Sequence, residues 1–355
     1  MKHLLLNPLL AIFLLFVIDN TAFAASIGLV YDYQQPPRSM CDHYEDFDNG
    51  FLCALRPSRL DAATRDIFDT DTQINRRSGF GYHAIMFPDK GVKIRGVYIH
   101  FGGSFGRPFN PVNNTFQSGT FLREAWDSGF IVIQLAYNNR YAVNSDDECG
   151  GDLLIDNCAG KIRREKILGG NSSPIADTPV ADSIEHRLTR LVEYLENRGI
   201  ELPINAISNG QINWPGMFLG GHSQGAGQAL YIGKYFGARH VCMLAGIHDV
   251  HDNVQASSPE LIADWFLDTS STIPRRKLRA ILAEDDPFYN QFVSAYGVLS
   301  LVENWHWKSF FAEQYFDEDH NEINTGHGAA IKDPSFRELR LRACFTRQYL
   351  WKDNF

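Results

Sequence analysis

One stretch decides the fold of this 355-residue chain: Met217-Phe218-Leu219-Gly220-Gly221-His222-Ser223-Gln224-Gly225-Ala226-Gly227. Residues 217–219 are apolar and predict a short buried strand, and residues 226–236 predict a helix. Between them, the run from Gly221 to Gly225 has the form Gly-x-Ser-x-Gly. In this pattern the serine occupies a strained turn, and the small residues on either side allow the backbones to approach closely. The pattern predicts that Ser223 is a nucleophile presented on a sharp turn from strand to helix.

A second match to the same pattern lies upstream, at Gly102-Gly103-Ser104-Phe105-Gly106. A strand predicted over residues 95–101 precedes it, but Pro108 and Pro111 follow at once. Two prolines there prevent a helix from starting directly after the serine. The context of strand, turn and helix therefore favours Ser223 over Ser104 as the nucleophile.

From about residue 80 onward, apolar runs bounded by Gly or Pro alternate with helical patterns. Strands that are apolar throughout, each followed by a helix, indicate an α/β fold with a mostly parallel central sheet and helices on both faces. The predicted strands are 81–87, 95–101, 130–137, 217–219, 240–245 and 280–283, and the predicted helices are 120–128, 182–197, 226–236 and 336–350. Two stretches, 138–178 and 246–274, fit no sheet element and are interpreted as cap-like insertions. Residues 26–78 yield no assignment.

The first 24 residues have the features of a signal peptide. An apolar run over residues 9–18 is followed by Ala22-x-Ala24, the small-residue ending that a signal peptidase cleaves. The run is shorter than the roughly 20 residues of a membrane-spanning helix, which argues against an anchor. No cysteine stands near the cleavage point, so a lipid anchor is not expected either. We expect a secreted or periplasmic protein whose residues 25–355 form a single domain carrying the two insertions.

All six cysteines lie in the predicted mature part, and an even number behind a signal peptide indicates disulfides. Spacing favours two short disulfide loops, and the last two cysteines then either pair over a long range or stay buried and free. The two short loops would join Cys41 to Cys53 and Cys149 to Cys158. The last two cysteines, which either pair or stay free, are Cys242 and Cys344.

No metal, cofactor or nucleic-acid site is predicted. The sequence has no Cys-x-x-Cys spacing, and His248-Asp249-Val250-His251-Asp252 offers two histidines without an identifiable third metal ligand. The formal net charge of −9 comes without a basic cluster that would suit nucleic acid or an anionic membrane surface. We expect no cofactor, no nucleic-acid partner and no stable membrane insertion after the signal peptide is removed.

Over roughly residues 80–350, the chain resembles the α/β-hydrolase superfamily, in particular its secreted serine hydrolases of the esterase and lipase type. The serine turn and the order Ser…Asp…His carry this resemblance, together with His100-Phe101-Gly102-Gly103-Ser104, which looks like a His-Gly-Gly-Gly loop with Phe101 in place of a glycine. The resemblance implies an oxyanion hole built from backbone N–H groups. Gln224, the residue after the serine, would supply one, and Gly103 or Ser104 the other.

The resemblance also implies an acid after a late strand and a histidine on a loop before the final helix. Asp286, which is followed by Pro287, is our choice of acid, with Asp285 as its nearest rival. In some lipases the acid follows the preceding strand, and here Asp249 and Asp252 occupy that place. Our choice of base is His327, which lies between two glycines shortly before the last predicted helix. The other two late histidines fit less well, and they are His306, between two tryptophans, and His320, in an acidic run.

These features predict a serine hydrolase that cleaves a carboxylic ester through an acyl-enzyme intermediate, with a small molecule or a polymer as the ester substrate. The alternatives are a catalytically silent hydrolase fold used for binding, or a peptidase or acyltransferase that uses the same triad. An apolar acyl or aromatic group is suggested by aromatic residues near the expected pocket, namely Phe101, Phe105, Phe109, Tyr137, Tyr141 and Trp265.

Overall fold

The structure is a computed structural model of the chain. It describes residues 35–66, 81–89, 93–111, 114–116, 119–140, 143, 149, 157–247, 249, 263–268, 270, 273–274, 277–293, 295–296, 315–316, 322–323 and 326–345. The predicted signal peptide lies outside these residues. Within them, no helix has both the length and the apolar character needed to cross a membrane.

A central sheet of eight strands forms the core of the structure, in the order β1-β2-β3-β7-β4-β10-β11-β12. The five strands from β7 to β12 are parallel to their neighbours, whereas β1, β2 and β3 join antiparallel at one edge. Their bounds are β1 His43–Phe47, β2 Gly50–Leu55, β3 His83–Pro88, β4 Gly96–Phe101, β7 Phe130–Leu135, β10 Phe218–His222, β11 His240–Leu244 and β12 Leu278–Ile281. Most of these strands are buried along their whole length, as expected for a sheet that is covered on both faces.

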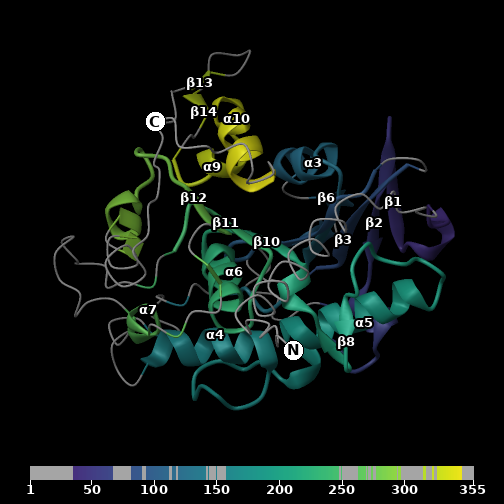
Figure 1. Cartoon of the computed structure of the whole chain (residues 1–355), viewed down its shortest axis with the longest axis horizontal. Coiled ribbons are helices and arrows are strands. Elements are labelled where there is room, and N and C mark those ends of the chain that lie inside the picture. Colours follow the sequence, from purple (N-terminus) through teal and green to yellow (C-terminus); the bar gives the residue numbers. More distant parts are fainter. Residues whose placement is uncertain are drawn as a thin grey trace, which may run out of the picture. The chain divides into compact units, whose positions relative to one another are not determined.

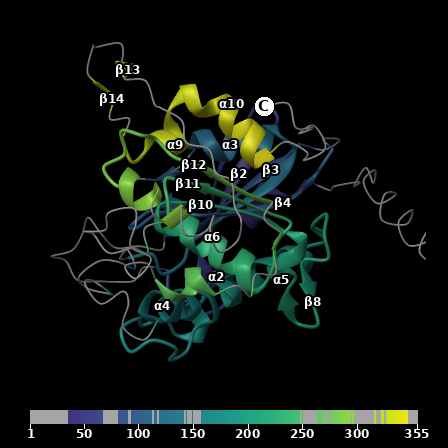
Figure 2. The same cartoon turned by 60° about the vertical axis from the view of Figure 1, so that its left-hand side comes forward.

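Helices cover both faces of this sheet (Figures 1 and 2). One face carries α3 (Gly119–Asp127), which contacts β3 and β7, together with α9 (Ala329–Lys332) and α10 (Arg337–Arg340). The other face carries α6 (Gln224–Tyr235), which packs on β4, β10 and β11, and beyond it α4 (Cys158–Leu168) and α5 (Ile184–Glu196). This mostly parallel sheet between two helical layers confirms the predicted α/β architecture. The remaining short elements are α2 (Pro57–Leu60), α7 (Asp264–Leu267), and the hairpins of β5 (Phe109–Asn110) with β6 (Thr115–Phe116), β8 (Ile207–Ser208) with β9 (Gln211–Ile212), and β13 (Tyr315–Phe316) with β14 (Glu322–Ile323).

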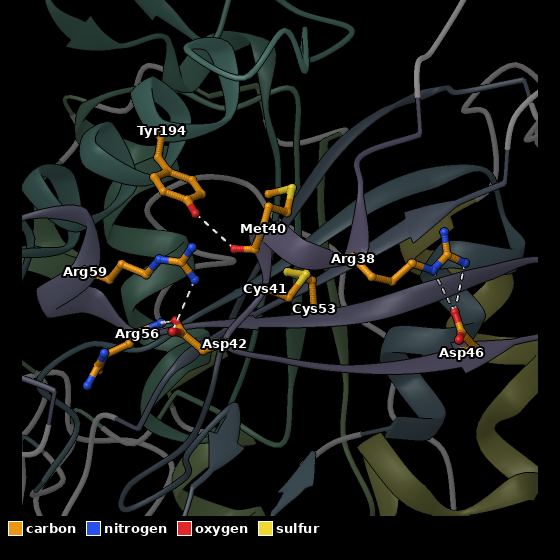
Figure 3. Close-up of a disulfide and its surroundings, with 9 residues drawn as sticks. All are labelled: Arg38, Met40, Cys41, Asp42, Asp46, Cys53, Arg56, Arg59 and Tyr194. Atoms are coloured by element: carbon orange, nitrogen blue, oxygen red, sulfur yellow. Dashed lines mark hydrogen bonds and ion pairs between the residues drawn. A yellow bond between two sulfur atoms is a disulfide. The ribbon is translucent and has the colours of Figure 1, made fainter.

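Two strands of the antiparallel edge, β1 and β2, come from residues 26–78, for which the sequence yielded no assignment, whereas β3 was predicted as the strand 81–87. A disulfide between Cys41 and Cys53, with Cα atoms 5.4 Å apart, joins the segment before β1 to β2 (Figure 3). The Tyr194 hydroxyl on α5 donates a hydrogen bond of 2.9 Å to the backbone oxygen of Met40. The N-terminal segment is thereby attached both to the sheet and to one helical layer.

Two further disulfides are present, one within the predicted insertion and one between the sheet and the C-terminal segment. Cys149 pairs with Cys158 at the start of α4, so both short loops favoured by the spacing are present. Cys242 on β11 pairs with Cys344, which joins the sheet to the segment after α10. The long-range option for the last two cysteines is therefore the one that forms.

Local structure departs from the predicted elements in two places. The described residues of 138–178 include no strand of the sheet, but they include α4, whose buried positions include Arg163, Glu165 and Lys166. A helix that buries charged side chains lacks the apolar periodicity from which helices are predicted. The predicted last helix, 336–350, is instead a short 3₁₀ turn, α10 and a π turn at Leu341–Phe345, the last described residues.

Candidate active site

Ser223 lies directly after β10 and caps the N-terminus of α6. Its backbone angles are φ 54° and ψ −124°, a sparsely populated combination for a residue with a side chain. The Ser223 N–H donates to the Leu244 oxygen over 2.9 Å, and the Ser223 oxygen accepts from the Ala226 N–H over 2.9 Å. The strained conformation of Ser223 is therefore maintained by a hydrogen bond to the neighbouring strand, β11, and by another to the first turn of α6.

The two glycines that flank this turn are required by close backbone approach. A Cβ atom at Gly221 would lie 2.1 Å from the Gly225 oxygen, and one at Gly225 would lie 2.1 Å from the Phe101 oxygen. Both distances are far below any van der Waals contact. The start of α6 thus packs directly against the end of β4, which brings the two Gly-x-Ser-x-Gly segments together.

The upstream segment, residues 102–106, is an ordered turn with no helix after it. Asn139 holds this turn, because its Nδ2 donates hydrogen bonds of 2.7 Å to the oxygens of Gly103 and Gly106. The Asn139 backbone oxygen also accepts from the Phe105 N–H over 2.9 Å, and the Tyr137 hydroxyl donates to the Gly102 oxygen over 2.7 Å. Sequence reasoning missed Asn139, which no local motif distinguishes.

Three backbone N–H groups beside Ser223 are available as donors. A Cβ atom at Gly103 would lie 3.1 Å from Ser223 Cβ, so the upstream turn adjoins the serine. Within the described part of the chain, the N–H groups of Gly103, Ser104 and Gln224 donate no hydrogen bond. These are the groups that the sequence indicates as oxyanion donors.

His327 and Asp286 form a hydrogen-bonded pair. His327 Nδ1 lies 2.9 Å from Asp286 Oδ2, and the Asp286 side chain is fully buried. The other carboxylate oxygen, Oδ1, accepts from the Phe288 N–H over 2.9 Å. An ionised carboxylate only accepts hydrogen bonds, so Nδ1 carries the proton and Nε2 of a neutral ring is free to accept one. Asp285, the rival acid, is exposed.

His327 reaches the serine turn through its neighbour His222. Its backbone oxygen lies 2.9 Å from His222 Nε2, and the two ring centroids are 5.0 Å apart. Among the described residues, no hydrogen bond joins Ser223 Oγ to the His327 ring. Such contacts are often long in unliganded enzymes and tighten when substrate binds.

The alternative acid, Asp249, has different partners. It forms a buried ion pair with Arg163 of α4, and its Oδ2 accepts from Trp265 Nε1 over 2.8 Å. Arg163 also donates to the Gln224 backbone oxygen over 3.3 Å, and Lys166 Nζ lies 3.1 Å from Gln224 Oε1. Asp249 therefore pairs with Arg163, and Arg163 and Lys166 connect α4 to the start of α6, an arrangement that the sequence did not suggest.

Several sequence candidates lie outside the described residues: His248, His251, Asp252, His306, His320 and Tyr141. Within the described residues, no group of three or more potential ligands could hold a metal ion.

The expected aromatic lining of a substrate pocket is largely wrong. Four of the six residues are core side chains no more than 2% exposed, and they are Phe101, Phe109, Tyr137 and Trp265. A cavity of about 640 Å³ lies along residues 165–179 and includes none of the candidate site residues in its lining. The aromatic side chains that do flank the candidate base are Phe288 and Phe292, with ring centroids 5.2 Å and 6.0 Å from that of His327.

No family model and no curated protein sequence matches this chain. Solved structures of hydrolases are similar to it at low sequence identity. An S-formylglutathione hydrolase from Agrobacterium tumefaciens has 11% identity and a TM-score of 0.44, over 85% of this chain and 99% of the other. A fluorophosphonate-binding serine hydrolase of Staphylococcus aureus also has 11% identity and a TM-score of 0.44, over 83% and 99%. A fungal esterase from Rhizomucor miehei has 12% identity and a TM-score of 0.41, over 88% and 86%.

The chain itself has a mostly parallel sheet between two helical layers, with a strained serine turn between the strand β10 and the helix α6. This is the arrangement of the α/β-hydrolase fold.

Proposed function

We propose that this chain is a serine hydrolase that cleaves a carboxylic ester through an acyl-enzyme intermediate. The observation that carries the proposal is the strained Ser223 turn with the hydrogen-bonded Asp286–His327 pair next to it. Strained backbone of this kind persists where the surrounding structure enforces it, and such residues cluster at functional sites.

In the proposed reaction, His327 Nε2 accepts the proton of Ser223 Oγ while Oγ attacks the ester carbonyl carbon. Asp286 holds the ring in the required tautomer and stabilises the imidazolium that forms. The N–H group of Gln224 and that of Gly103 or Ser104 stabilise the negative oxygen of the tetrahedral intermediate. His327 then protonates the leaving alkoxide, and a water activated by the same ring hydrolyses the acyl-enzyme.

The compartment is part of the proposal. Three disulfides join described parts of the chain, and stable disulfides form in oxidising environments. Together with the signal-like N-terminus, they support secretion or export to a periplasm.

The proposal is tested with purified protein and p-nitrophenyl esters of increasing acyl length. We expect hydrolysis with a burst of one p-nitrophenol per active site when deacylation is slower than acylation. The Ser223→Ala variant, matched for fold by its melting temperature, should show neither burst nor turnover. A folded wild-type protein that hydrolyses none of these esters and reacts with no fluorophosphonate would contradict the proposal and favour a silent hydrolase fold. Preferred cleavage of an amide would instead indicate a peptidase, and preferred transfer to an acyl acceptor other than water would indicate an acyltransferase.

A further inference from the structure

His222, the residue before the candidate nucleophile, contacts more of the site than its sequence position suggests. It ends β10, where it is in register with Leu244 of β11. Its Nε2 lies 2.9 Å from the backbone oxygen of His327. On the other side, a Cβ atom at Gly103 would lie 3.1 Å from His222 Nδ1. The ring is therefore held between the loop of the candidate base and the turn of the candidate oxyanion donors.

The chemistry of the first contact fixes how the ring is protonated. A carbonyl oxygen can only accept a hydrogen bond, so His222 Nε2 must donate. Burial, together with the charge of the neighbouring His327, lowers the pKa of His222 to about 4, so the ring is neutral near pH 7. A neutral ring with its proton on Nε2 has none on Nδ1. The only proton of the ring is thus committed to the main chain of His327.

We infer that His222 is a positioning residue: its Nε2–H holds the backbone of His327 against the turn that carries Ser223, and its ring supports Gly103. This inference rests on the proposed function. The His327 side chain is fixed at Nδ1 by Asp286, and His222 fixes the main chain of the same residue. Two contacts from different strand ends then determine where Nε2 of the base lies relative to Ser223 Oγ.

The size of the effect follows from geometry. A displacement of about 1 Å between reacting groups can lower a rate about 100-fold, even when the change is remote from the bond that breaks. Loss of the His222 hydrogen bond should therefore lower the acylation rate constant, whereas binding of the ester in its ground state should change little.

The experiment compares two substitutions at one position. His222→Leu removes the donor and keeps a similar volume. His222→Gln keeps an N–H donor at a similar reach but cannot take up a proton as a base. Presteady-state reaction with a p-nitrophenyl ester gives the acylation rate constant, and the burst amplitude gives the number of competent sites.

The matched control is His240→Leu. His240 is a buried histidine on the neighbouring strand, and it begins β11, in register with Phe218 at the opposite end of β10 from His222. It makes no contact with the candidate site in the described residues. Its replacement should change packing near the sheet without changing the acylation rate constant.

We expect His222→Leu to lower the acylation rate constant about 10- to 100-fold, with the burst kept for an ester whose acylation stays much faster than its deacylation. The dissociation constant of the ester, taken from the substrate dependence of the burst rate, should stay within about threefold of wild type, and His222→Gln should restore the rate constant to within about threefold. Three results would overturn the inference while the wild-type burst remains: a wild-type rate constant in His222→Leu, an equal loss in His222→Gln, or a loss confined to the burst amplitude. A folded wild type without any burst would overturn the proposed function and the inference with it.

Discussion

Two segments of this chain share the pattern Gly-x-Ser-x-Gly and differ in everything that the pattern does not specify. In residues 221–225, the serine has a φ of 54° and begins a buried helix, and its neighbours reach His327. In residues 102–106, the serine lies in a turn without a helix, and the positive φ, 62°, falls on Phe105. The comparison teaches that the residues after the motif decide its structure, since prolines follow one segment and helix formers the other.

The two segments also depend on different parts of the molecule. The serine turn is held by backbone contacts to its neighbours β11 and β4, where glycines permit close packing. The upstream turn is held by the side chains of Asn139 and Tyr137. We therefore expect the serine turn to tolerate few backbone changes and the upstream turn to be sensitive to changes of these two side chains.

The largest expected difference lies between the two serines. Ser223→Ala should lower kcat for an ester by about 10⁶, because the nucleophile is lost, as measured in steady-state assays with active-site concentration held constant. Ser104→Ala should retain kcat within about tenfold, since only a backbone N–H of Ser104 is proposed to act and alanine keeps it. Equal losses in the two variants would remove the distinction between the segments.

The next effect concerns the acid proposed to serve Ser223, in residues 221–225. Asp286→Asn should lower kcat about 10⁴-fold, because an amide favours the wrong tautomer of His327. Asp285→Asn is the matched control and should leave kcat nearly unchanged, because the Asp285 side chain is exposed.

Asp249→Asn completes this series. It should lower the midpoint of urea unfolding, since it leaves Arg163 buried with a neutral partner. A wild-type kcat in Asp286→Asn, combined with a lower kcat in a folded Asp249→Asn variant, would indicate that the catalytic acid is Asp249, in the region after β11.

A smaller effect is expected where the upstream segment is held. Asn139→Leu removes two hydrogen bonds from the turn of residues 102–106 and should lower kcat about 10- to 100-fold by misplacing the oxyanion donors. Asn138→Leu is the matched control, because Asn138 Nδ2 donates to Thr178 Oγ1 and the Asp177 oxygen, outside this turn. Comparable kcat losses in both variants, measured beside their melting temperatures, would show that Asn139 acts only through stability.

The smallest effect is on stability as a function of pH. His100, which precedes the upstream segment, has a pKa lowered to about 3 by burial and by the nearby His222, against about 6.5 in an unfolded chain. Between these values the unfolded chain binds a proton that the folded chain does not. The free energy of unfolding should therefore be highest above pH 6.5 and fall as the pH drops toward 3.

His100→Leu should reduce that slope by about one proton, or about 1.4 kcal/mol per pH unit, in urea unfolding between pH 7 and pH 4.5. His240, buried with a pKa of about 3, provides a second position at which the same flattening is expected. An unchanged slope in both variants would mean that these histidines are not neutral in the folded state.

Much of the fold could be predicted because its strands are apolar and its turns carry glycine. The strand before Ser223 and the helix after it were predicted within three residues at each end, as Phe218–His222 and Gln224–Tyr235. The missed helix α4 buries Arg163, Glu165 and Lys166, which are paired only in three dimensions.

The candidate site likewise contains residues that a local sequence pattern reveals and residues that only the three-dimensional structure reveals. Glycines flank three of the candidate residues, and such local patterns are visible in a sequence. These residues are Ser223, Gly103 and His327. Asn139 and His222 act through hydrogen bonds to the main chain of distant residues, separated by 33 to 105 positions. No local pattern encodes such contacts, because the acceptor is a backbone oxygen present at every residue.

The central claim is that only one of the two serines is a nucleophile, and covalent labelling tests it most directly. Exported, folded protein is treated with a fluorophosphonate, digested, and the adduct is located by mass spectrometry of the peptides. We predict one adduct per chain, on Ser223, and none in the folded Ser223→Ala variant. An adduct on Ser104, or no adduct on the folded wild-type protein, would contradict the account.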